Sequence, residues 1–153
     1  RQVSRGRMSE DEHRRILDNI VTGRFAAQEL SGCSLVIESV SEDRHTKKDM
    51  LGQIERVIPA STILATNTSG LAVSGLATAL RLPERFLGLH FFSPAERMRL
   101  VEVVRGERTS TVALQDGLAF VESIGKVPIV VRDGPSFFAT RVFAAYLDEA
   151  VCM

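Results

Sequence analysis

The sequence is short of several features that define large classes of protein. Its 153 residues contain no tryptophan, one tyrosine and two cysteines, and 19 basic side chains balance 19 acidic ones. A nucleic-acid-binding domain normally carries a basic excess, so the balanced charge argues against a nucleic-acid partner. Cys33 and Cys152 stand too far apart for a CxxC redox pair or a zinc knuckle, and we expect two reduced thiols and no metal site.

Long apolar runs are absent too. No run approaches the roughly 18 residues that a membrane-spanning helix needs, and no apolar segment of the secretory kind follows the basic residues at the start. These absences predict a cytoplasmic protein without a membrane span. The chain begins with Arg1 instead of Met and stops at Met153 within an apolar stretch, so we expect a piece of a longer protein.

What the sequence does have is an alternation of short apolar runs with amphipathic segments. The runs that predict strands are residues 34–38, 62–66, 86–92, 99–104 and 127–131. The segments that predict helices are residues 9–23, 42–57, 73–80, 114–124 and 137–151. Ser9 and Glu12 form a capping box at the start of the first helix, and Gly125 ends the fourth. This alternation predicts an α/β domain with a mostly parallel sheet.

The last predicted helix differs from the others. Turn residues at 132–136 separate it from the preceding strand, and its side chains are more apolar than covering a sheet requires. We therefore divide the chain into residues 1–132, a portion of the α/β domain, and residues 133–153, the start of a helical domain.

Polar residues gather where the predicted strands end, which is where ligands collect in open α/β sheets. Residues 38–42, residues 67–69 and His90 all fall at such ends. Glu102 lies in the next strand among apolar neighbours, where an unpaired carboxylate would be costly. A hairpin-like return could place Glu102 against one nitrogen of His90 and leave the other nitrogen as an acid or base. The alternative is a purely structural buried ion pair.

Several motifs occur in the order and spacing of one enzyme family. They are Ile-Leu-Ala-Thr-Asn-Thr-Ser at 63–69, Gly-Leu-His-Phe-Phe-Ser-Pro at 88–94, Leu-Val-Glu-Val-Val at 100–104 and Gly-Lys-Val-Pro-Ile-Val-Val-Arg-Asp at 125–133. With these motifs the chain resembles 3-hydroxyacyl-CoA dehydrogenase, in particular the dehydrogenase part of multifunctional fatty-acid oxidation proteins. The resemblance implies a partial Rossmann-type doubly wound sheet and the first helix of an all-α domain that serves substrate binding and dimerisation. It also implies NAD as cofactor, an acyl-CoA substrate, and a homodimer or a larger multifunctional chain.

The resemblance also implies roles for individual residues. The family oxidises the 3-hydroxyl of an acyl-CoA to a ketone and passes hydride to NAD. By resemblance, His90 takes the hydroxyl proton, Glu102 orients and supports His90, and Ser69 bonds the substrate oxygen. The residues that the resemblance places along the cofactor are Val40, Ser41, Glu42, Lys47, Asn67, Ser69 and Ser93. The residues that it places on the substrate are Lys47, Ser69 and Thr140.

Simpler explanations exist for some of these residues, and the sequence departs from the family in places. Asn67 and Ser69 are also typical of turns and helix caps, and Glu42 and Lys47 of an exposed helix start. Ser93 and Thr140 stand where the family commonly has asparagine, but each keeps a short polar group. Ser136 replaces a glycine, which costs about 1 kcal/mol if the position needs a positive φ.

The glycine-rich phosphate motif of dinucleotide-binding sheets is absent. None of the eleven glycines forms even a GxG pair, so we interpret the first βαβ unit as missing, with most of the helical domain. The strand at 35–38 should then be an unpaired apolar edge that invites self-association or aggregation. We expect NAD-dependent oxidation of 3-hydroxyacyl-CoA in fatty-acid β-oxidation. The alternatives are a non-catalytic interaction protein that lost the cofactor half, and a 3-hydroxybutyryl-CoA or hydroxyacid dehydrogenase of the same fold.

We predict that these 153 residues by themselves bind NAD poorly and do not turn over, because the backbone amides that hold the pyrophosphate belong to the missing motif. Calorimetric titration of the chain with NADH checks this. Binding at micromolar affinity would contradict the prediction.

Overall fold

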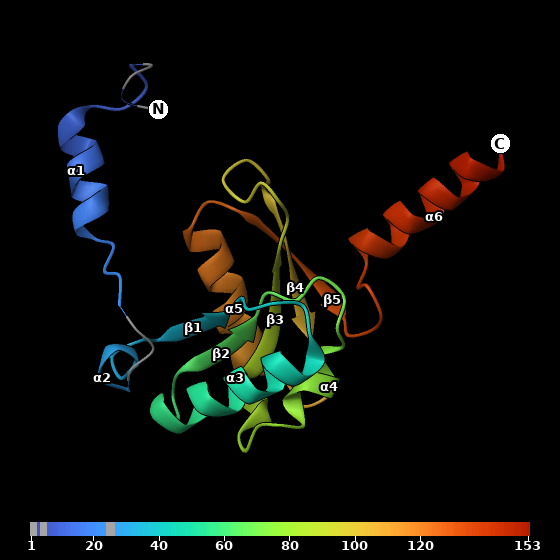
Figure 1. The fold of residues 1–153 in the computed structure, drawn as a ribbon, viewed down its shortest axis with the longest axis horizontal. Helices are drawn as coiled ribbons and strands as arrows, with labels where there is room; N and C mark the ends of the chain where they lie inside the picture. Colours follow the sequence, from blue (N-terminus) through green and yellow to red (C-terminus); the bar gives the residue numbers. More distant parts are fainter. Residues whose placement is uncertain (1–2, 4–5, 24–26) are drawn as a thin grey trace.

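A five-stranded sheet forms the centre of the computed structural model, which describes residues 3, 6–23 and 27–153 (Figure 1). Arg1, where the sequence begins, lies outside the described residues. The strands, in their order across the sheet, are β1 (Leu35–Glu38), β2 (Ile63–Thr66), β3 (Phe86–Phe91), β4 (Leu100–Arg105) and β5 (Val127–Arg132). Neighbouring strands are parallel except β3 and β4, which are antiparallel. The predicted α/β fold with a mostly parallel sheet is confirmed.

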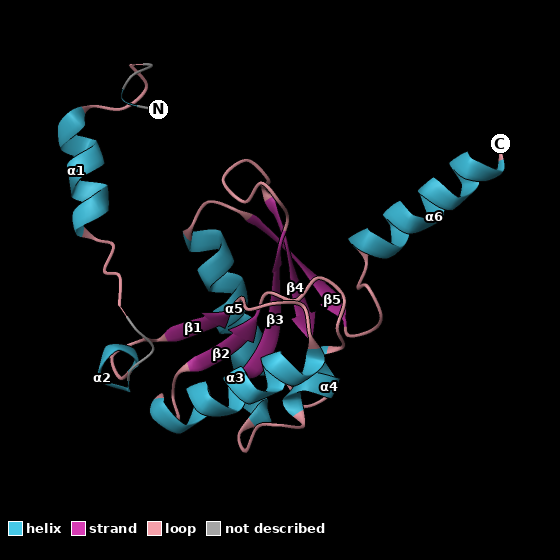
Figure 2. Cartoon of the chain, in the orientation of Figure 1, coloured by secondary structure: helices cyan, strands magenta, loops and turns pink. Residues whose placement is uncertain are grey.

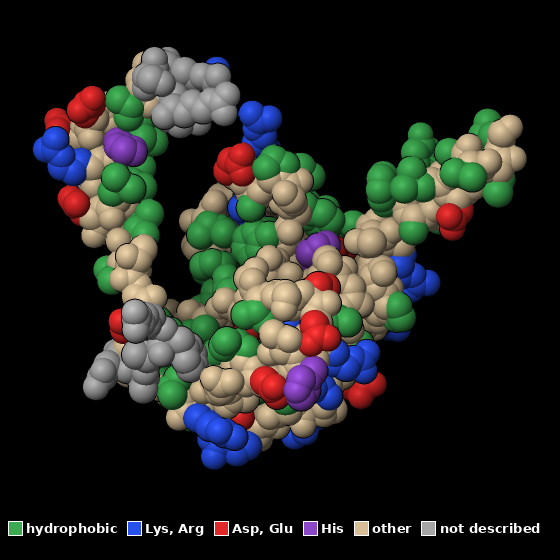
Figure 3. Space-filling view, viewed as in Figure 1, with side chains coloured by type: hydrophobic (Ala, Val, Ile, Leu, Met, Phe, Trp, Pro, Cys, Tyr) green, Lys and Arg blue, Asp and Glu red, His purple; other side chains and the backbone are tan. Residues whose placement is uncertain are grey.

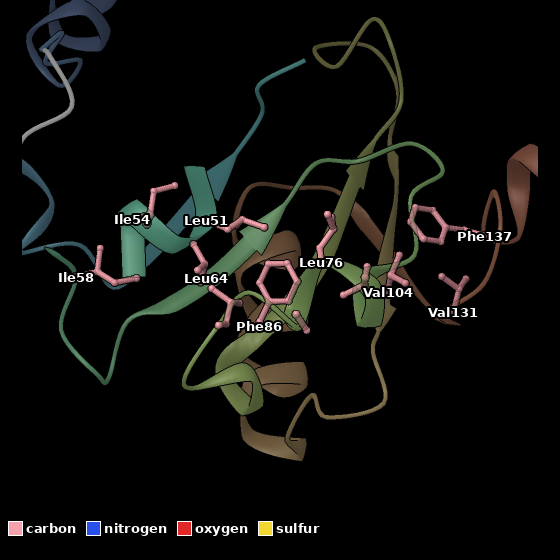
Figure 4. Packing of buried hydrophobic residues seen from close by; sticks show 12 residues of the cluster. Leu51, Ile54, Ile58, Leu64, Leu76, Phe86, Val104, Val131 and Phe137 are labelled. Atoms are coloured by element: carbon pink, nitrogen blue, oxygen red, sulfur yellow. The ribbon is translucent and has the colours of Figure 1, made fainter. Parts of the chain in front are cut away.

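Helices cover both faces of this sheet (Figure 2). The described helices are α1 (Glu10–Asp18), α2 (Ala27–Leu30), α3 (Arg44–Val57), α4 (Val73–Ala77), the 3-10 helix η2 (Pro83–Arg85), α5 (Thr111–Ser123) and α6 (Ala139–Cys152). Successive strand residues point to opposite faces. Phe86 and Val104 therefore pack with α3 and α4, whereas Leu87 and Val103 pack with α5. Figure 4 shows the first of these clusters, which extends from Ile58 after α3 to Phe137 before α6.

Several helix limits differ from the sequence prediction. The helix predicted at 9–23 ends at Asp18, because β-branched residues and Asn19 follow, which favour helix less. The predicted fourth helix begins three residues early, at Thr111, since the Ser110 hydroxyl accepts the Ala113 amide at 3.1 Å. The short elements α2 and η2 were not predicted, because single turns of helix leave no periodic pattern.

The edge strand β1 and the helices at the two ends of the chain, α1 and α6, have apolar side chains that the described residues do not fully cover. β1 pairs only with β2, so it is an edge strand in this part of the chain, as predicted. Neither α1 nor α6 has a buried residue, and both extend away from the sheet (Figure 1). In the space-filling view, apolar side chains cover much of the α6 surface (Figure 3). No helix in the described ranges is long and apolar enough to cross a membrane.

Gly88 allows α4 to approach the sheet closely. A Cβ atom added at this position would lie 2.8 Å from the Val104 Cβ and 3.0 Å from the Val73 Cγ2. Any larger residue would push α4 away from β3. The close approach matters for the site below, because Gly88 lies two residues before His90 on the same strand.

Four described positions have left-handed backbone, and three of them, Gly125, Ser136 and Phe137, lie at the ends of helices near the sheet. Gly125 has a φ of 73° and ends α5, where the Lys126 amide donates to the Val121 carbonyl at 3.2 Å. Ser136 and Phe137 have φ values of 58° and 49°, in the turn before α6. Ser136 therefore occupies a left-handed position, the case in which the glycine of the family that the sequence resembles would be favoured.

Replacing Ser136 with glycine should raise the free energy of unfolding by roughly 0.5–1 kcal/mol. Left-handed strain of about 1–2 kcal/mol is relieved, and the extra flexibility of glycine in the unfolded chain offsets part of it. Urea denaturation measures the change. Gly125→Ala is the matched control and should lower stability, because it introduces the same strain. A Ser136→Gly protein that is no more stable than the parent would contradict the prediction.

Candidate functional site

His90 and Glu102 face each other near the carboxyl end of β3. They are directly opposite in the antiparallel pairing of β3 and β4, which points both side chains to the same face of the sheet. His90 Nδ1 lies 2.7 Å from Glu102 Oε2, and the two side chains are 8% and 0% exposed. The predicted contact is confirmed. Its geometry is set by strand register, not by a flexible loop.

The surroundings of His90 favour one arrangement of its ring protons. Phe92 and Phe137 lie with ring centroids 4.5 and 5.8 Å from the imidazole, so its faces are largely apolar. A carboxylate can only accept a hydrogen bond, and therefore the neutral ring carries its proton on Nδ1. Nε2 then keeps a free lone pair, and it makes no hydrogen bond to any residue within the described ranges. This is the arrangement of a general base.

Glu102 has further partners that the sequence did not reveal. Its Oε1 accepts hydrogen bonds from the backbone amides of Phe138 at 3.0 Å and Ala139 at 2.7 Å. Both oxygens of a fully buried carboxylate are thereby satisfied. Every residue type except proline has a backbone N–H, so no sequence signal could have indicated these donors.

Asn67 ties the ends of three strands together. Its Oδ1 accepts the Phe91 amide at 3.0 Å, its Nδ2 donates to the Ser39 hydroxyl at 3.2 Å, and its own amide donates to the Glu38 carbonyl at 2.8 Å. The side chain thus holds β2 to β3 and to the residue after β1. These bonds give Asn67 a structural role next to the proposed cofactor role.

The Glu42 carboxylate closes the loops that follow β1 and β2 against each other. Oε1 accepts bonds from the Thr68 hydroxyl at 2.5 Å, the Ser69 amide at 2.9 Å and the Gly70 amide at 3.2 Å. The Ser69 hydroxyl also donates to it, at 3.2 Å. Burial alone raises the pKa of Glu42, but these hydrogen bonds and the charge of Lys47 outweigh it and hold the pKa below its ordinary value. Glu42 and Ser69, both predicted site residues, are therefore brought together.

Lys47 is a buried cation beneath the same loops. Its side chain is 1% exposed, and Nζ lies 2.9 Å from Glu38 Oε1, 3.2 Å from the Val40 carbonyl and 3.4 Å from Glu42 Oε2. Glu38 also accepts bonds from the Thr66 hydroxyl and the Val40 amide. Sequence reasoning placed Glu38 at a strand end but did not pair it with Lys47. The ammonium is enclosed by these oxygens, so in this structure Lys47 shapes the loop after β1.

The remaining predicted residues lie at the margins of this site. Ser41 and Ser93 are exposed and lie in the loops that follow β1 and β3. Thr140 is half-buried in the first turn of α6, directly after Ala139. The described residues contain no group of three or more His, Cys, Asp or Glu side chains that could hold a metal ion.

Comparison with known proteins assigns the fold to a family. Residues 1–134 match the sequence profile of the 3-hydroxyacyl-CoA dehydrogenase, NAD binding domain. The chain belongs to this dehydrogenase family. Members of this family are oxidoreductases that act on a CH–OH group with NAD. The domain that residues 1–134 match is the one that binds NAD in this family.

Solved structures of the family superpose closely on this dehydrogenase chain. M. tuberculosis FadB2 is 33% identical with a TM-score of 0.92, over 99% of this chain and 54% of FadB2. The (S)-3-hydroxybutyryl-CoA dehydrogenase PaaH1 from Ralstonia eutropha is 31% identical with a TM-score of 0.93, over 99% and 53%. The 3-hydroxybutyryl-CoA dehydrogenase from Escherichia coli K12 is 36% identical with a TM-score of 0.92, over 97% and 31%. The chain thus spans 31–54% of the length of these relatives.

The lowered pKa of Glu42 predicts a pH-dependent contribution to stability. A carboxylate whose pKa is lower in the folded than in the unfolded chain stabilises the fold above its ordinary pKa, and this stabilisation is lost as pH falls through the folded value. Glu42→Gln should therefore destabilise the protein more at neutral pH than at about pH 3–4. Denaturant titrations at both pH values measure the difference. Glu122→Gln, on the exposed side of α5, is the control and should show no such dependence; equal losses for Glu42→Gln at both pH values would contradict the assignment.

Proposed function

We propose that this chain supplies the proton-transfer site of an enzyme that oxidises 3-hydroxyacyl-CoA to 3-oxoacyl-CoA with NAD. The observation that carries the proposal is the buried His90–Glu102 pair at 2.7 Å, at the carboxyl end of a Rossmann-type sheet. Oxidation of a secondary alcohol removes a proton from oxygen and a hydride from carbon. Removal of the proton needs a base that is held in a fixed position, and the contact with Glu102 holds His90 in this way.

His90 and Glu102 would act as a unit. The 3-hydroxyl gives its proton to Nε2, and the ring becomes an imidazolium with Nδ1–H still directed at Glu102. The buried carboxylate then stabilises the positive charge that forms, since opposite charges attract strongly where water is excluded. In the reverse direction the same imidazolium returns the proton to the oxygen of the ketone.

Ser69 is suited to hold the substrate oxygen. It is exposed, it follows β2 at the carboxyl edge of the sheet, and its amide is fixed on Glu42. Glu42 Oε1 also accepts the Thr68 hydroxyl and the Gly70 amide, so the Ser69 hydroxyl can turn away from it and donate to the substrate oxygen, whose own proton is directed at His90. We therefore assign to Ser69 the positioning of the 3-hydroxyl, and to Thr140 a contact with the substrate from the side of α6.

The chemistry of the donor set fits the reactive end of NAD better than its pyrophosphate. When bound, NAD accepts the hydride. The residues proposed to lie along it are Val40, Ser41, Glu42, Asn67, Ser69 and Ser93, with Lys47 behind them. Their hydroxyl, amide and carboxylate groups suit a polar nicotinamide and ribose, whereas the described residues offer no glycine-rich turn for the diphosphate. Residues 1–132 are accordingly proposed as part of the NAD-binding domain, and residues 133–153 as the start of the helical domain.

A narrower substrate range is the second candidate. Two of the similar structures carry the name 3-hydroxybutyryl-CoA dehydrogenase, at 36% and 31% identity. This favours a short acyl chain over the longer substrates of fatty-acid β-oxidation. Rates with 3-hydroxyacyl-CoA substrates of several chain lengths separate the two possibilities, since a short-chain enzyme loses activity steeply with each added pair of carbons.

In the full-length protein, His90→Gln should lower kcat by about 10²–10⁴-fold, because the base is lost, and should change NADH affinity little. NADH formation from a 3-hydroxyacyl-CoA and NAD measures the rate, and fluorescence titration measures NADH binding. His45→Gln is the matched control: His45 is exposed on α3, with its ring 3.3 Å from Asp49, and its replacement should leave both values unchanged. A His90→Gln enzyme with near-normal turnover would refute the proposed mechanism.

A further inference from the structure

The contact between Glu102 and α6 joins the proposed base to a helix on the far side of the domain boundary. Glu102 Oε2 faces His90, while Oε1 accepts the amides of Phe138 and Ala139. One carboxylate group cannot rotate to improve one set of bonds without weakening the other. The orientation of Glu102 toward His90 thus depends on where the first turn of α6 lies.

The two amides are donors that α6 cannot satisfy itself. The first N–H groups of a helix have no partner within it, and Phe138, which precedes α6, provides no side-chain cap. The first intrahelical bond runs from the Val142 amide to the Phe138 carbonyl. A buried carboxylate at this end also interacts favourably with the helix dipole. Glu102 is therefore the cap of α6 as well as the partner of His90.

The turn before α6 is anchored so that these amides point at Glu102. Asp133 accepts the amides of Val73 at 2.8 Å and Ser74 at 2.7 Å, which fixes the beginning of the turn to α4. Ser136 and Phe137 then take up left-handed backbone, which reverses the chain. The Phe137 side chain is 3% exposed within the core and lies 5.8 Å from the His90 ring.

Beyond this turn, α6 has little hold on the sheet. No residue of α6 is buried, and large apolar side chains such as Phe143 and Tyr146 are 59% and 69% exposed. The Phe138 and Ala139 amides, with the buried Phe137 ring, are thus the principal link between α6 and the sheet among the described residues. A shift of α6 would be transmitted to Glu102 through these two bonds.

We propose that the first turn of α6 is a positioning element for His90: its amides hold Glu102 in the orientation that keeps the Nδ1 proton of His90 in place and Nε2 free. The catalytic meaning of this coupling rests on the proposed function. The coupling itself does not, because it can be measured in the protein without substrate or cofactor. According to this proposal, the catalytic geometry depends on the position of α6 as well as on the His90–Glu102 pair.

Ala139→Pro tests the proposal, because proline removes the shorter of the two amide bonds and is accepted at the first position of a helix. The readout is the NMR signal of the His90 ring in the chain labelled with ¹⁵N histidine. We expect exchange of the Nδ1 proton with water to become roughly tenfold faster and the ring nitrogen shifts to move toward those of a mixture of tautomers. His13 and His45 report any general change, and their signals should stay in place.

Arg141→Pro is the matched control, since it places the same residue in the same turn, where the amide does not reach Glu102. Its His90 signals should equal those of the parent protein. Unchanged His90 signals in Ala139→Pro would overturn the proposal, as would equal changes in the two variants. Should Ala139→Pro fail to fold, His90→Gln tests the same coupling from the other side: exchange of the Phe138 and Ala139 amides must change by several-fold, and unchanged exchange would overturn it.

Activity of the full-length protein separates this inference from the proposed function. Slower turnover in Ala139→Pro with unchanged NADH binding supports both. Altered His90 signals in a protein that oxidises no 3-hydroxyacyl-CoA would leave the coupling standing and remove the proposed function. If the full-length protein oxidises 3-hydroxyacyl-CoA but Ala139→Pro leaves the His90 signals unchanged, the proposed function stands and the coupling is overturned.

Discussion

The hydrogen bonds of the fully buried Glu102 carboxylate connect the proposed base, the sheet and the start of α6, and the geometry of the site depends on them. The carboxylate is satisfied on one side by His90 and on the other by the first amides of α6. An unpaired charge in this position would be very costly, so the strand pair, the turn at 133–138 and the start of the helix stabilise one another through this carboxylate. The group that prepares the base for chemistry is therefore also a group that holds the fold together.

Other acidic side chains join elements in the same way. Asp133 caps the amides at the start of α4, and Glu42 collects the hydroxyl and amide donors of the loop after β2. Glu55, which is 4% exposed, accepts the amides of Arg81 and Leu82 and lies 3.8 Å from Arg85. In each case a carboxylate takes up backbone donors at a loop or helix start, where regular secondary structure leaves them without partners. The polar framework thus complements the two apolar layers.

The sequence predicted much of the fold because its signals are local. Short apolar runs located each of the described strands. A polar residue in each of two consecutive apolar strands suggested a return that could bring Glu102 to His90, and the antiparallel register of β3 and β4 confirms this contact. Helix limits were less accurate where a cap was overlooked, as at Ser110, or where a few β-branched residues ended a helix early, as after Asp18. The left-handed position of Ser136 was anticipated from a glycine in the family, whereas that of Phe137 was not.

By itself, the sequence determined the order of the strands and of the longer helices, the family, and the residues that could carry the chemistry, because side-chain type and periodicity express these directly. Only the tertiary structure decided which partners those residues have. It enclosed Lys47 between Glu38 and Glu42, made Asn67 a tie between three strand ends, and placed Glu102 on the amides of α6. The physical reason is that such partners lie many residues apart along the chain and are often backbone groups, which look the same in every sequence.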